Sequence, residues 1–382
     1  MDNCVIPHGY KATALGIIPQ EWEVMLLGNL SNSISSGRNK HRDAHGQYPV
    51  FGSTGIIGYS STYEYEGPVI LVARVGANAG TLNFASGQYD VSDNTLIITI
   101  KQNVYDYNFA YNQLTHYKLN KLVFGSGQPL ITSKQLKNIR IPVPPLAEQR
   151  KIAEVLGVWD KAIEKQARLI EKLALRKRAL MQRLLSAKLR LPGFSEPWKI
   201  HKLQELFTER NETNRTDLPL LSITGDRGVI LQTESEKRDT SNDDKSKYKR
   251  IAKGDIGYNT MRMWQGRSAL SGLEGIVSPA YTIVVPNTDV DGYYMSVLFK
   301  QPRLIYDFWT HSQGLVGDTL NCKYRDFGQV HICCPPLAEQ KAITEVLTAA
   351  DREIELAKEK LERLRRQKRG LMQQLLTGKK RI

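Results

Sequence analysis

A six-residue motif that occurs twice constrains the fold of this chain more than any other feature. Pro-Pro-Leu-Ala-Glu-Gln stands at 144–149 and again at 335–340, and the similarity then continues without a gap to the end of the chain. About half of the aligned positions are identical, and internal similarity of that length indicates a true duplication. The chain has 382 residues, which is enough for two or three domains. We therefore expect two copies of one structural plan.

Each copy predicts one long helix. The double proline marks its start, because proline is tolerated only in the first turn of a helix. Glu148 and Glu339 then lie near the positive end of the helix dipole. Apolar residues follow at alternating steps of four and three, the spacing of a coiled-coil seam. Lys177 and Lys368 interrupt the two seams at equivalent positions. The residues of this helix-pair seam are Ile152, Leu156, Trp159, Ile163, Ile170 and Leu173 in the first copy and Ile343, Leu347, Ile354, Leu361 and Leu364 in the second.

The length of the helices predicts that they are antiparallel. Each has on the order of 40 residues, or about 60 Å at 1.5 Å per residue. The segment between them is domain-sized, with an expected radius of gyration of roughly 15 Å, so it cannot bridge that length. The second helix must begin near the end of the first and run back along it. Two unrelated core helices are the less favoured alternative.

The remaining segments are predicted to be rich in β-strands. Val69–Ala73 and Asp93–Ile100 in the first, and Gly254–Tyr258 and Tyr281–Val285 in the second, are short apolar stretches between Gly-rich turns. A tryptophan opens each segment, Trp22 and Trp198. We therefore predict an α+β chain with a pseudo-two-fold internal repeat, in which a long antiparallel two-helix coiled coil separates two β-rich domains. The expected boundaries are 1–143 and 192–334 for the domains and 144–191 and 335–382 for the helices.

The charge favours a polyanionic partner, most often nucleic acid. The net charge is +14 and the pI is about 9.5. The two repeat copies hold 24 Lys and Arg against 12 Asp and Glu, whereas the two globular segments hold 29 against 27. A nucleic-acid face on the globular segments must therefore come from local asymmetry. The basic helices would suit a neighbouring duplex or acidic partners equally well.

Catalytic signatures are missing from the sequence, which predicts a chain that is not itself an enzyme. Gly378-Lys379 lacks both the upstream glycine and the hydroxyl residue of a phosphate-binding loop. Neither Pro-Pro pair belongs to the Asp/Asn-Pro-Pro-aromatic run of an amino-methylating site. His41 and His45 have the spacing of metal ligands on a helix, but their polar surroundings predict a loop, so no metal site is expected.

The sequence also predicts a cytoplasmic protein. The N-terminus shows no signal peptide, and the longest apolar stretches are far short of a membrane span. The four cysteines lack disulfide-scaffold or metal-type spacing, so we expect buried, reduced thiols.

Polar and aromatic residues suited to DNA gather in Gly-rich or charged loops. Arg, Asn and Gln can bond guanine or adenine edges in pairs, while Lys, Ser and Thr mostly hold phosphates. The candidates in the first globular segment are Arg38, Lys40, Arg42, Ser53, Thr54, Arg74, Asn78, Ser126 and Gln128. Those in the second are Arg227, Lys245, Lys247, Tyr248, Asn259, Arg262, Trp264, Gln265 and Arg267. An ordinary exposed loop position remains the alternative for each single residue.

The order domain–helix–domain–helix, the opening tryptophans and the repeated motif resemble the specificity (S) subunit of type I restriction-modification enzymes, the HsdS family. Further residues carry the resemblance, which covers essentially the whole chain. They are Tyr48 to Gly55, Ile57-Gly58-Tyr59, Gly254-Asp255-Ile256 and Gly275 to Tyr281.

This resemblance implies a function in DNA recognition. Each globular segment would be a target recognition domain for one half of a bipartite, asymmetric site in double-stranded DNA. The helix pair would set the spacer and dock two methyltransferase (M) subunits, which would use S-adenosylmethionine to methylate adenine at N6. Restriction and translocase (R) subunits would use ATP and Mg²⁺. Recognition domains of this family vary widely, so no base-contacting residue carries over from it.

Two other classes of function stay open. A non-catalytic coiled-coil adaptor whose end domains bind proteins would fit the nearly neutral globular segments. A self-contained nuclease or methylase is less favoured, because the catalytic signatures are missing.

Overall fold

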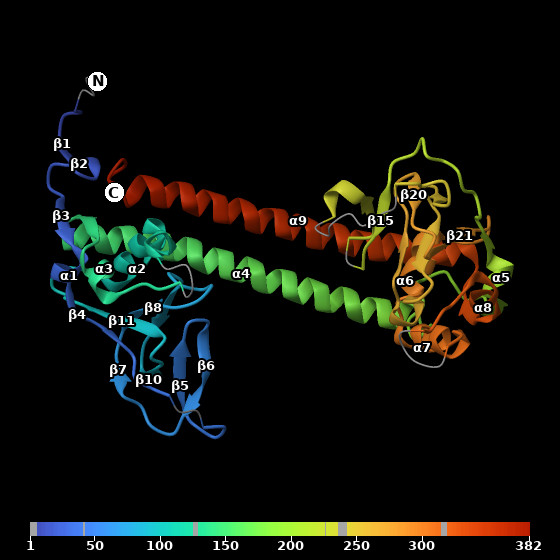
Figure 1. Cartoon of the computed structure of the whole chain (residues 1–382), viewed down its shortest axis with the longest axis horizontal. Coiled ribbons are helices and arrows are strands. Elements are labelled where there is room, and N and C mark those ends of the chain that lie inside the picture. The colour runs from blue at the N-terminus through green and yellow to red at the C-terminus, as the bar shows by residue number, and fades with distance from the viewer. Residues whose placement is uncertain (1–5, 41–42, 125–128, 226, 236–242, 315–318) are drawn as a thin grey trace. The chain divides into compact units, whose positions relative to one another are not determined.

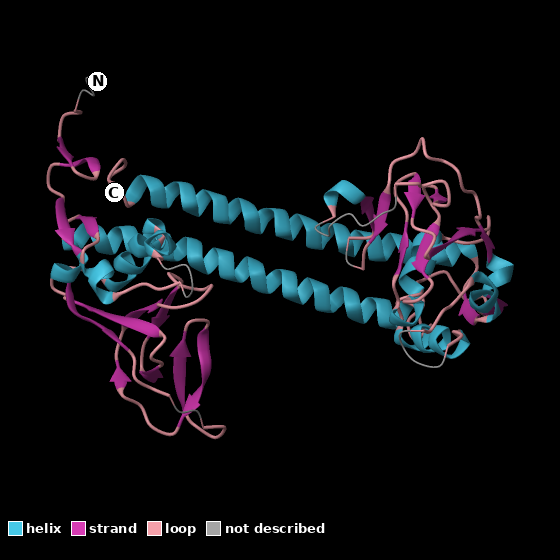
Figure 2. Cartoon of the chain, in the orientation of Figure 1, coloured by secondary structure: helices cyan, strands magenta, loops and turns pink. Residues whose placement is uncertain are grey.

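The computed structural model divides into two compact units. It describes residues 6–40, 43–124, 129–225, 227–235, 243–314 and 319–382. Unit 1 comprises residues 1–169 and 357–382, and unit 2 comprises residues 170–356. Each unit holds one β-rich part and stretches of both long helices, as the predicted α+β class requires (Figure 2).

The two long helices are α4 (Leu146–Leu184) and α9 (Leu337–Leu375), each of 39 residues (Figure 1). Both begin directly after a double proline. The sequence predicted helix over 144–191, but the chain leaves the helix at Leu184 and Ala187 adopts a left-handed backbone, φ 57°. The repeat-equivalent Gly378 has φ 72°, and a Cβ there would lie 2.3 Å from Pro19 Cδ, so only glycine fits.

Within each unit the stretches of α4 and α9 run antiparallel. In unit 1, Ile152 packs in one core with Leu375, and the ammonium of Lys368 donates to Asp160 at 2.6 Å. In unit 2, Lys177 donates to Asp351 at 2.5 Å. The two lysines that interrupt the seams therefore each bond an aspartate of the opposite helix. Because the aspartates are also repeat-equivalent, one contact is made twice.

The helix-pair seam is buried or half-buried at every predicted position. The side chains of Ile152, Leu156 and Leu347 are fully buried. Between Ile163 and Ile170 the seam holds Gln166, which is 7% exposed and donates from Nε2 to the carbonyl oxygen of Ala357 at 3.0 Å. Gln166 and Ala357 are themselves repeat-equivalent.

In unit 1 the centre of the β-rich part is a four-stranded sheet in the order β4-β11-β8-β9, and a second sheet has the order β6-β5-β10-β7. β1 pairs with β2, and β12 with β3. The strands are β1 (Tyr10–Thr13), β2 (Gly16–Pro19), β3 (Glu23–Leu26), β4 (Ser31–Ser36), β5 (Tyr48–Gly52), β6 (Gly55–Ser60), β7 (Tyr65–Glu66), β8 (Val69–Ala73), β9 (Leu82–Ala85), β10 (Gln88–Val91), β11 (Thr95–Ile100) and β12 (Arg140–Val143). The short helices are α1 (Leu27–Leu30), α2 (Tyr107–Tyr117), η1 (Leu119–Leu122) and α3 (Ser133–Lys137).

Unit 2 repeats the central sheet in the order β14-β21-β18-β19, and its terminal strand β22 pairs with β13. Two further pairs, β15-β16 and β17-β20, replace the second sheet of unit 1. The strands are β13 (Lys199–Lys202), β14 (Phe207–Glu209), β15 (Leu221–Ile223), β16 (Val229–Leu231), β17 (Lys249–Ile251), β18 (Ile256–Asn259), β19 (Ser268–Leu270), β20 (Gly275–Val277), β21 (Tyr281–Pro286) and β22 (His331–Cys334). The short helices are α5 (Leu203–Leu206), η2 (Gln232–Glu234), η3 (Met263–Gln265), α6 (Gly292–Leu298), α7 (Pro302–His311) and α8 (Tyr324–Gln329).

The central strand β8 is apolar throughout because both of its faces are buried. On β8, Ile70 and Val72 face the larger core of unit 1, which also holds the helix residues, while Leu71 faces a smaller core with Tyr89. In unit 2, Val284 and Ile283 divide between two cores in the same way. The four strand segments predicted from the sequence all form strands, with ends shifted by at most two residues.

The expectation of buried thiols is wrong for Cys333. It is exposed, whereas Cys322 and Cys334 are buried, because alternate residues of β22 face opposite sides. Cys4 lies outside the described residues.

The described residues contain no helix with the length and apolarity of a membrane span. They also contain no group of three His, Cys, Asp or Glu side chains placed to hold a metal ion.

Candidate nucleic-acid interface

The duplicated motif anchors each β-rich part to the start of a long helix. Trp22 donates from Nε1 to Glu148 at 3.1 Å, and Trp198 donates to Glu339 at 3.2 Å. Arg381 donates to both carboxylate oxygens of Glu148, at 2.6 and 3.0 Å. The hydrogen bond to Glu148, and a second to Glu21, raise the pKa of Arg381.

The same arrangement recurs in unit 2, where Arg190 donates to Glu339 at 2.6 and 2.8 Å. Both glutamates are buried, at 7% and 1% exposed for Glu148 and Glu339. The sequence placed them only at a helix start, and it did not predict that each would accept bonds from a tryptophan and an arginine.

The glutamine that ends each motif is a second anchor. Gln149 accepts from the backbone N–H of Asp106 at 2.8 Å, and Gln340 accepts from that of Asp291 at 2.9 Å. Each of those aspartates then caps a short helix, α2 or α6, with its side chain. One motif used twice therefore fixes the start of a short helix in each β-rich part.

Three segments meet at the same place in both β-rich parts, which we call the loop junction. In unit 1 the N–H of Ile131 donates to the carbonyl of Arg74 at 2.8 Å, and the N–H of Arg74 donates to that of Asn94 at 3.0 Å. In unit 2, Cys322 donates to Thr260 at 2.8 Å and Thr260 to Ala280 at 3.1 Å. One backbone framework therefore presents different side chains, Arg74 in one part and Thr260 in the other.

Several candidates of unit 1 lie around its loop junction. Half-buried Arg74 donates from Nη1 to Ser36 Oγ at 2.7 Å, which joins the ends of β8 and β4. The N–H groups of Arg38 and Asn39 both donate to Val91 O, so the backbone here is held while the Arg38 side chain stays 82% exposed. Its guanidinium lies 3.7 Å from Glu64.

Other candidates of unit 1 are exposed to different degrees. Lys40, Thr54 and Asn78 are exposed, and Ser53 is half-buried in the β5–β6 turn. A backbone bond from Ser92 to Phe51 holds that turn's strand to the end of β10. Arg42, Ser126 and Gln128 lie outside the described residues.

In unit 2 five candidates lie at the end of β18 or in its connection to β19. They are Asn259, Arg262, Trp264, Gln265 and Arg267, of which Gln265 and Arg267 are exposed. Trp264 donates from Nε1 to Met261 O at 3.0 Å, so its ring is held against the loop.

The turn that carries exposed Arg227 lies at the same end of the sheet. The hydroxyl of Tyr281 donates to Ile223 O, at the end of β15, and Tyr281 pairs with Asn259 across the strands. Arg227 lies four residues beyond the end of β15, so its turn and the β18–β19 connection are neighbours.

The candidates at 245–248 behave differently. Lys247 is exposed and Lys245 is half-buried, but Tyr248 is only 7% exposed. The ring of Tyr248 is therefore buried inside unit 2 and is not available for stacking on a base.

Sequence reasoning missed a groove with several basic side chains at the loop junction of unit 2. Its volume is about 610 Å³, and its lining includes Thr260, Asn321, Lys323, Arg325 and Lys249. The Lys249 ammonium lies 3.7 Å from Glu209. Lys323 and Arg325 carry no motif of their own, and the signal that could have found them is the alignment of 319–325 with 128–134 at the equivalent junction.

The arrangement offers basic and amide donors on two dissimilar loop surfaces. Such a surface can bind phosphates and base edges.

Comparisons with known proteins agree with this geometry. A family model described as the type I restriction modification DNA specificity domain matches residues 19–174. The chain is 26% identical to a putative type I restriction enzyme MjaX specificity subunit of Methanocaldococcus jannaschii, over 98% of this chain and 97% of the relative. It is 24% identical to the MjaVIII specificity subunit of the same organism, over 96% and 94%.

A solved structure shares the fold. The type I restriction-modification system S subunit from M. genitalium is similar with a TM-score of 0.59 at 16% identity, covering 93% of this chain and 96% of that one.

Proposed function

We propose that this chain is a member of the family of type I restriction-modification specificity subunits and that it selects the DNA sequence on which a modification complex acts. The observation that carries the proposal is the loop junction. The same main-chain bonds recur in both β-rich parts, but the side chains that they present differ. Two domains that share a backbone framework but present different side chains suit a DNA site whose two halves differ in sequence.

We further propose residues 1–143 and 192–334 as the two target recognition domains. Arg38, Arg74, Asn78 and the β5–β6 turn would contact one half-site. Arg227, the β18–β19 connection and the groove with Lys323 and Arg325 would contact the other. Arginine and asparagine or glutamine would bond base edges, and lysines and hydroxyls would hold phosphates.

The chemistry would belong to partner subunits. Two methyltransferase subunits would bring S-adenosylmethionine and methylate adenine at N6, and restriction subunits would use ATP and Mg²⁺. The chain itself would be a non-catalytic, cytoplasmic recognition subunit. The exposed basic side chains of α4 and α9 would face DNA or acidic partner surfaces.

Single-molecule methylome sequencing of a host that expresses this chain with its cognate methyltransferase subunit tests the function. We expect one new methyladenine motif with two unlike halves and an unspecified gap. A stable complex that produces no new motif would favour the protein-binding adaptor instead.

The salt dependence of DNA binding separates the same two functions in vitro. A protein that neutralises six to ten phosphates should lose roughly 10³- to 10⁵-fold in affinity between 50 and 200 mM salt. Fluorescence anisotropy of the complex on a duplex that carries the motif measures this loss. An adaptor should show no such affinity at any salt concentration.

A further inference from the structure

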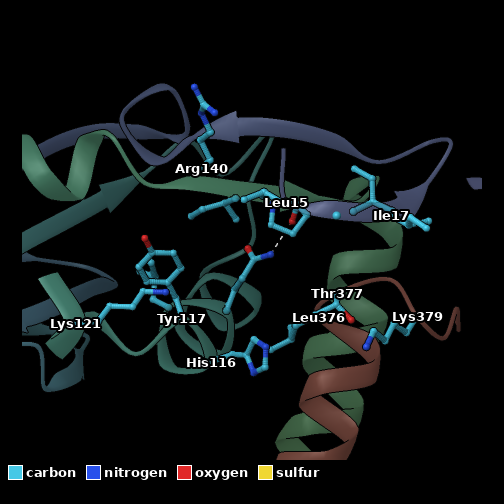
Figure 3. Close-up of a pocket in the computed structure, with 15 residues that line it drawn as sticks. Leu15, Ile17, His116, Tyr117, Lys121, Arg140, Leu376, Thr377 and Lys379 are labelled. Carbon is cyan, nitrogen blue, oxygen red and sulfur yellow. Dashed lines mark hydrogen bonds between the residues drawn. The ribbon is translucent and has the colours of Figure 1, made fainter. Parts of the chain in front are cut away.

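One apolar pocket is built twice in this chain, once in each unit. The α9-end pocket of unit 1 has a volume of about 500 Å³ and lies between β12, α2 and the end of α9 (Figure 3). The α4-end pocket of unit 2 has a volume of about 410 Å³ and lies between β22, α7 and the end of α4. Each pocket is contained in one unit.

Repeat-equivalent residues form the walls of the two pockets. Arg140, Ile141 and Pro142 line the first, and His331, Ile332 and Cys333 line the second at positions 191 higher. Leu376 and Thr377 of the first correspond to Leu185 and Ser186 of the second. Thr377 and Ser186 even make the same hydrogen bond, to the carbonyl four residues earlier, at 2.5 and 2.6 Å.

The pockets have apolar floors and polar rims. Ile141 and Leu376 are buried at 2% and 1% exposed, whereas Arg140 and Lys379 on the rim are exposed. Phosphates of DNA would leave such a floor unfilled, but an apolar side chain of a partner protein would fill it. Buried anchors of this kind, ringed by polar contacts, dominate the energy of protein interfaces.

The rim charge indicates what surrounds the anchor. The α9-end pocket is lined by His116, Lys121, Arg140 and Lys379, and its lining includes no Asp or Glu. Figure 3 shows His116, Tyr117 and Lys121 on one side and Lys379 beyond the end of α9 on another. Burial, with Lys118 and Lys121, lowers the pKa of His116, as an excess of positive charge would. The α4-end pocket has Arg303 and His331 but also Asp307.

We propose that the two pockets dock the two methyltransferase subunits, each pocket receiving an apolar anchor side chain from an acidic segment of one subunit. The inference rests on the proposed function and adds to it the surface that sets the stoichiometry. A pocket built twice suits a partner present in two copies. The fully basic rim makes the α9-end pocket the tighter and more salt-sensitive site.

Matched blocking variants test the proposal. Thr377→Trp fills the α9-end pocket and Ser186→Trp fills the α4-end pocket, while Glu66→Trp on exposed β7 adds the same ring elsewhere. Native mass spectrometry of the full chain with the cognate methyltransferase subunit should show two copies bound to wild type and to the control. Each single variant should keep one copy, and the double variant should keep none.

A charge reversal and the reactivity of a thiol test the same pockets without the introduction of a large side chain. Arg140→Glu with Lys379→Glu should weaken binding of one copy roughly ten-fold. Exposed Cys333 lies in the α4-end pocket, so iodoacetamide should modify it in the free chain and not in the wild-type complex.

Definite outcomes overturn the proposal. They are two bound copies with either blocking variant, and loss of both copies from a single variant whose melting temperature and DNA affinity match wild type. Continued modification of Cys333 in the complex also contradicts it. The proposed function fails separately, if wild type with two bound copies methylates no motif.

Discussion

At the scale of single residues, one buried glutamate joins each β-rich part to a long helix. It is Glu148 in unit 1 and Glu339 in unit 2. Glu339 is 1% exposed and accepts from Trp198 and twice from Arg190. Removal of the charge from such an acceptor weakens charge-assisted bonds and leaves donors poorly paired.

We expect Glu339→Gln to lower the free energy of unfolding by about 1.5–3 kcal/mol. Urea denaturation followed by circular dichroism measures the change. Arg190→Met completes a double-mutant cycle, in which the two losses should not add because both variants break the same bonds. Additive losses would show that the pair does not hold the junction.

The three described cysteines should differ in reactivity. Burial raises the pKa of Cys322 to about 12 and that of Cys334 to about 11, so few of their thiolates exist at pH 8. Exposed Cys333 should therefore react first with iodoacetamide in the free chain. Mass mapping of peptides at timed intervals checks the order, and equal rates at Cys322 and Cys333 would contradict it.

At the scale of elements, two equivalent aspartates on the helix pair have unequal partners. Among the described residues, the carboxylate of Asp160 accepts a side-chain hydrogen bond from Lys368. Asp351 accepts from Lys177 and also from the hydroxyl of Tyr293 in α6, at 2.6 Å. Burial and the bond to Asp351 raise the pKa of Tyr293.

Asp351→Asn should therefore destabilise the chain more than Asp160→Asn. Both carboxylates are about half exposed, so the lysine pair contributes about 0–1 kcal/mol in each case. The tyrosine bond adds about 1 kcal/mol at Asp351 only. Midpoints of thermal unfolding for the two variants, measured side by side, would disprove this account if they were equal.

The sequence predicts elements well where their pattern is long or their burial is complete. The helix pair follows from a seam that persists over many turns, and β8 and β11 follow from continuous apolar runs. The C-terminal end of α4 is followed by the left-handed backbone of Ala187. Alanine seldom adopts that conformation, so the sequence did not predict where the helix ends. The Trp22–Glu148 bond joins residues 126 positions apart, so no local pattern could predict it.

The candidate site was harder to predict than the fold. Arg227 and the β18–β19 connection become neighbours only through the pairing of β18 with β21. Tyr248 had the right chemistry, but its ring is buried. Lys323 and Arg325 lie in the groove because main-chain bonds of the loop junction position their segment. Main-chain bonds do not depend on residue type, so the sequence could not predict this placement.

At the scale of the whole molecule, α4 and α9 each run through both units without a break. If the pair sets the separation of the two half-sites, its length should determine the spacer. Seven residues added to each helix preserve the heptad seam and lengthen it by about 10.5 Å.

Insertion of one heptad after Leu169 and another after Leu356 should therefore lengthen the unspecified gap by about three base pairs, at 3.4 Å per pair. Both half-sites should stay the same, because the loop junctions are untouched. Methylome sequencing measures gap and half-sites together. New half-sites with an unchanged gap would refute the idea that the helices act as a ruler.

The loop junctions have a consequence for how such a chain changes over generations. Because main-chain groups close each junction, exchange of the Arg74 or Thr260 side chain leaves those main-chain bonds in place. Only the side-chain bonds, from Arg74 to Ser36 and from Thr260 to Ala280, would be lost. The bonds that close each junction therefore belong mainly to backbone atoms, whereas the proposed contacts to DNA belong to side chains. Under the proposed function, substitutions at one junction would change one half of the target and leave the main-chain bonds of both junctions in place.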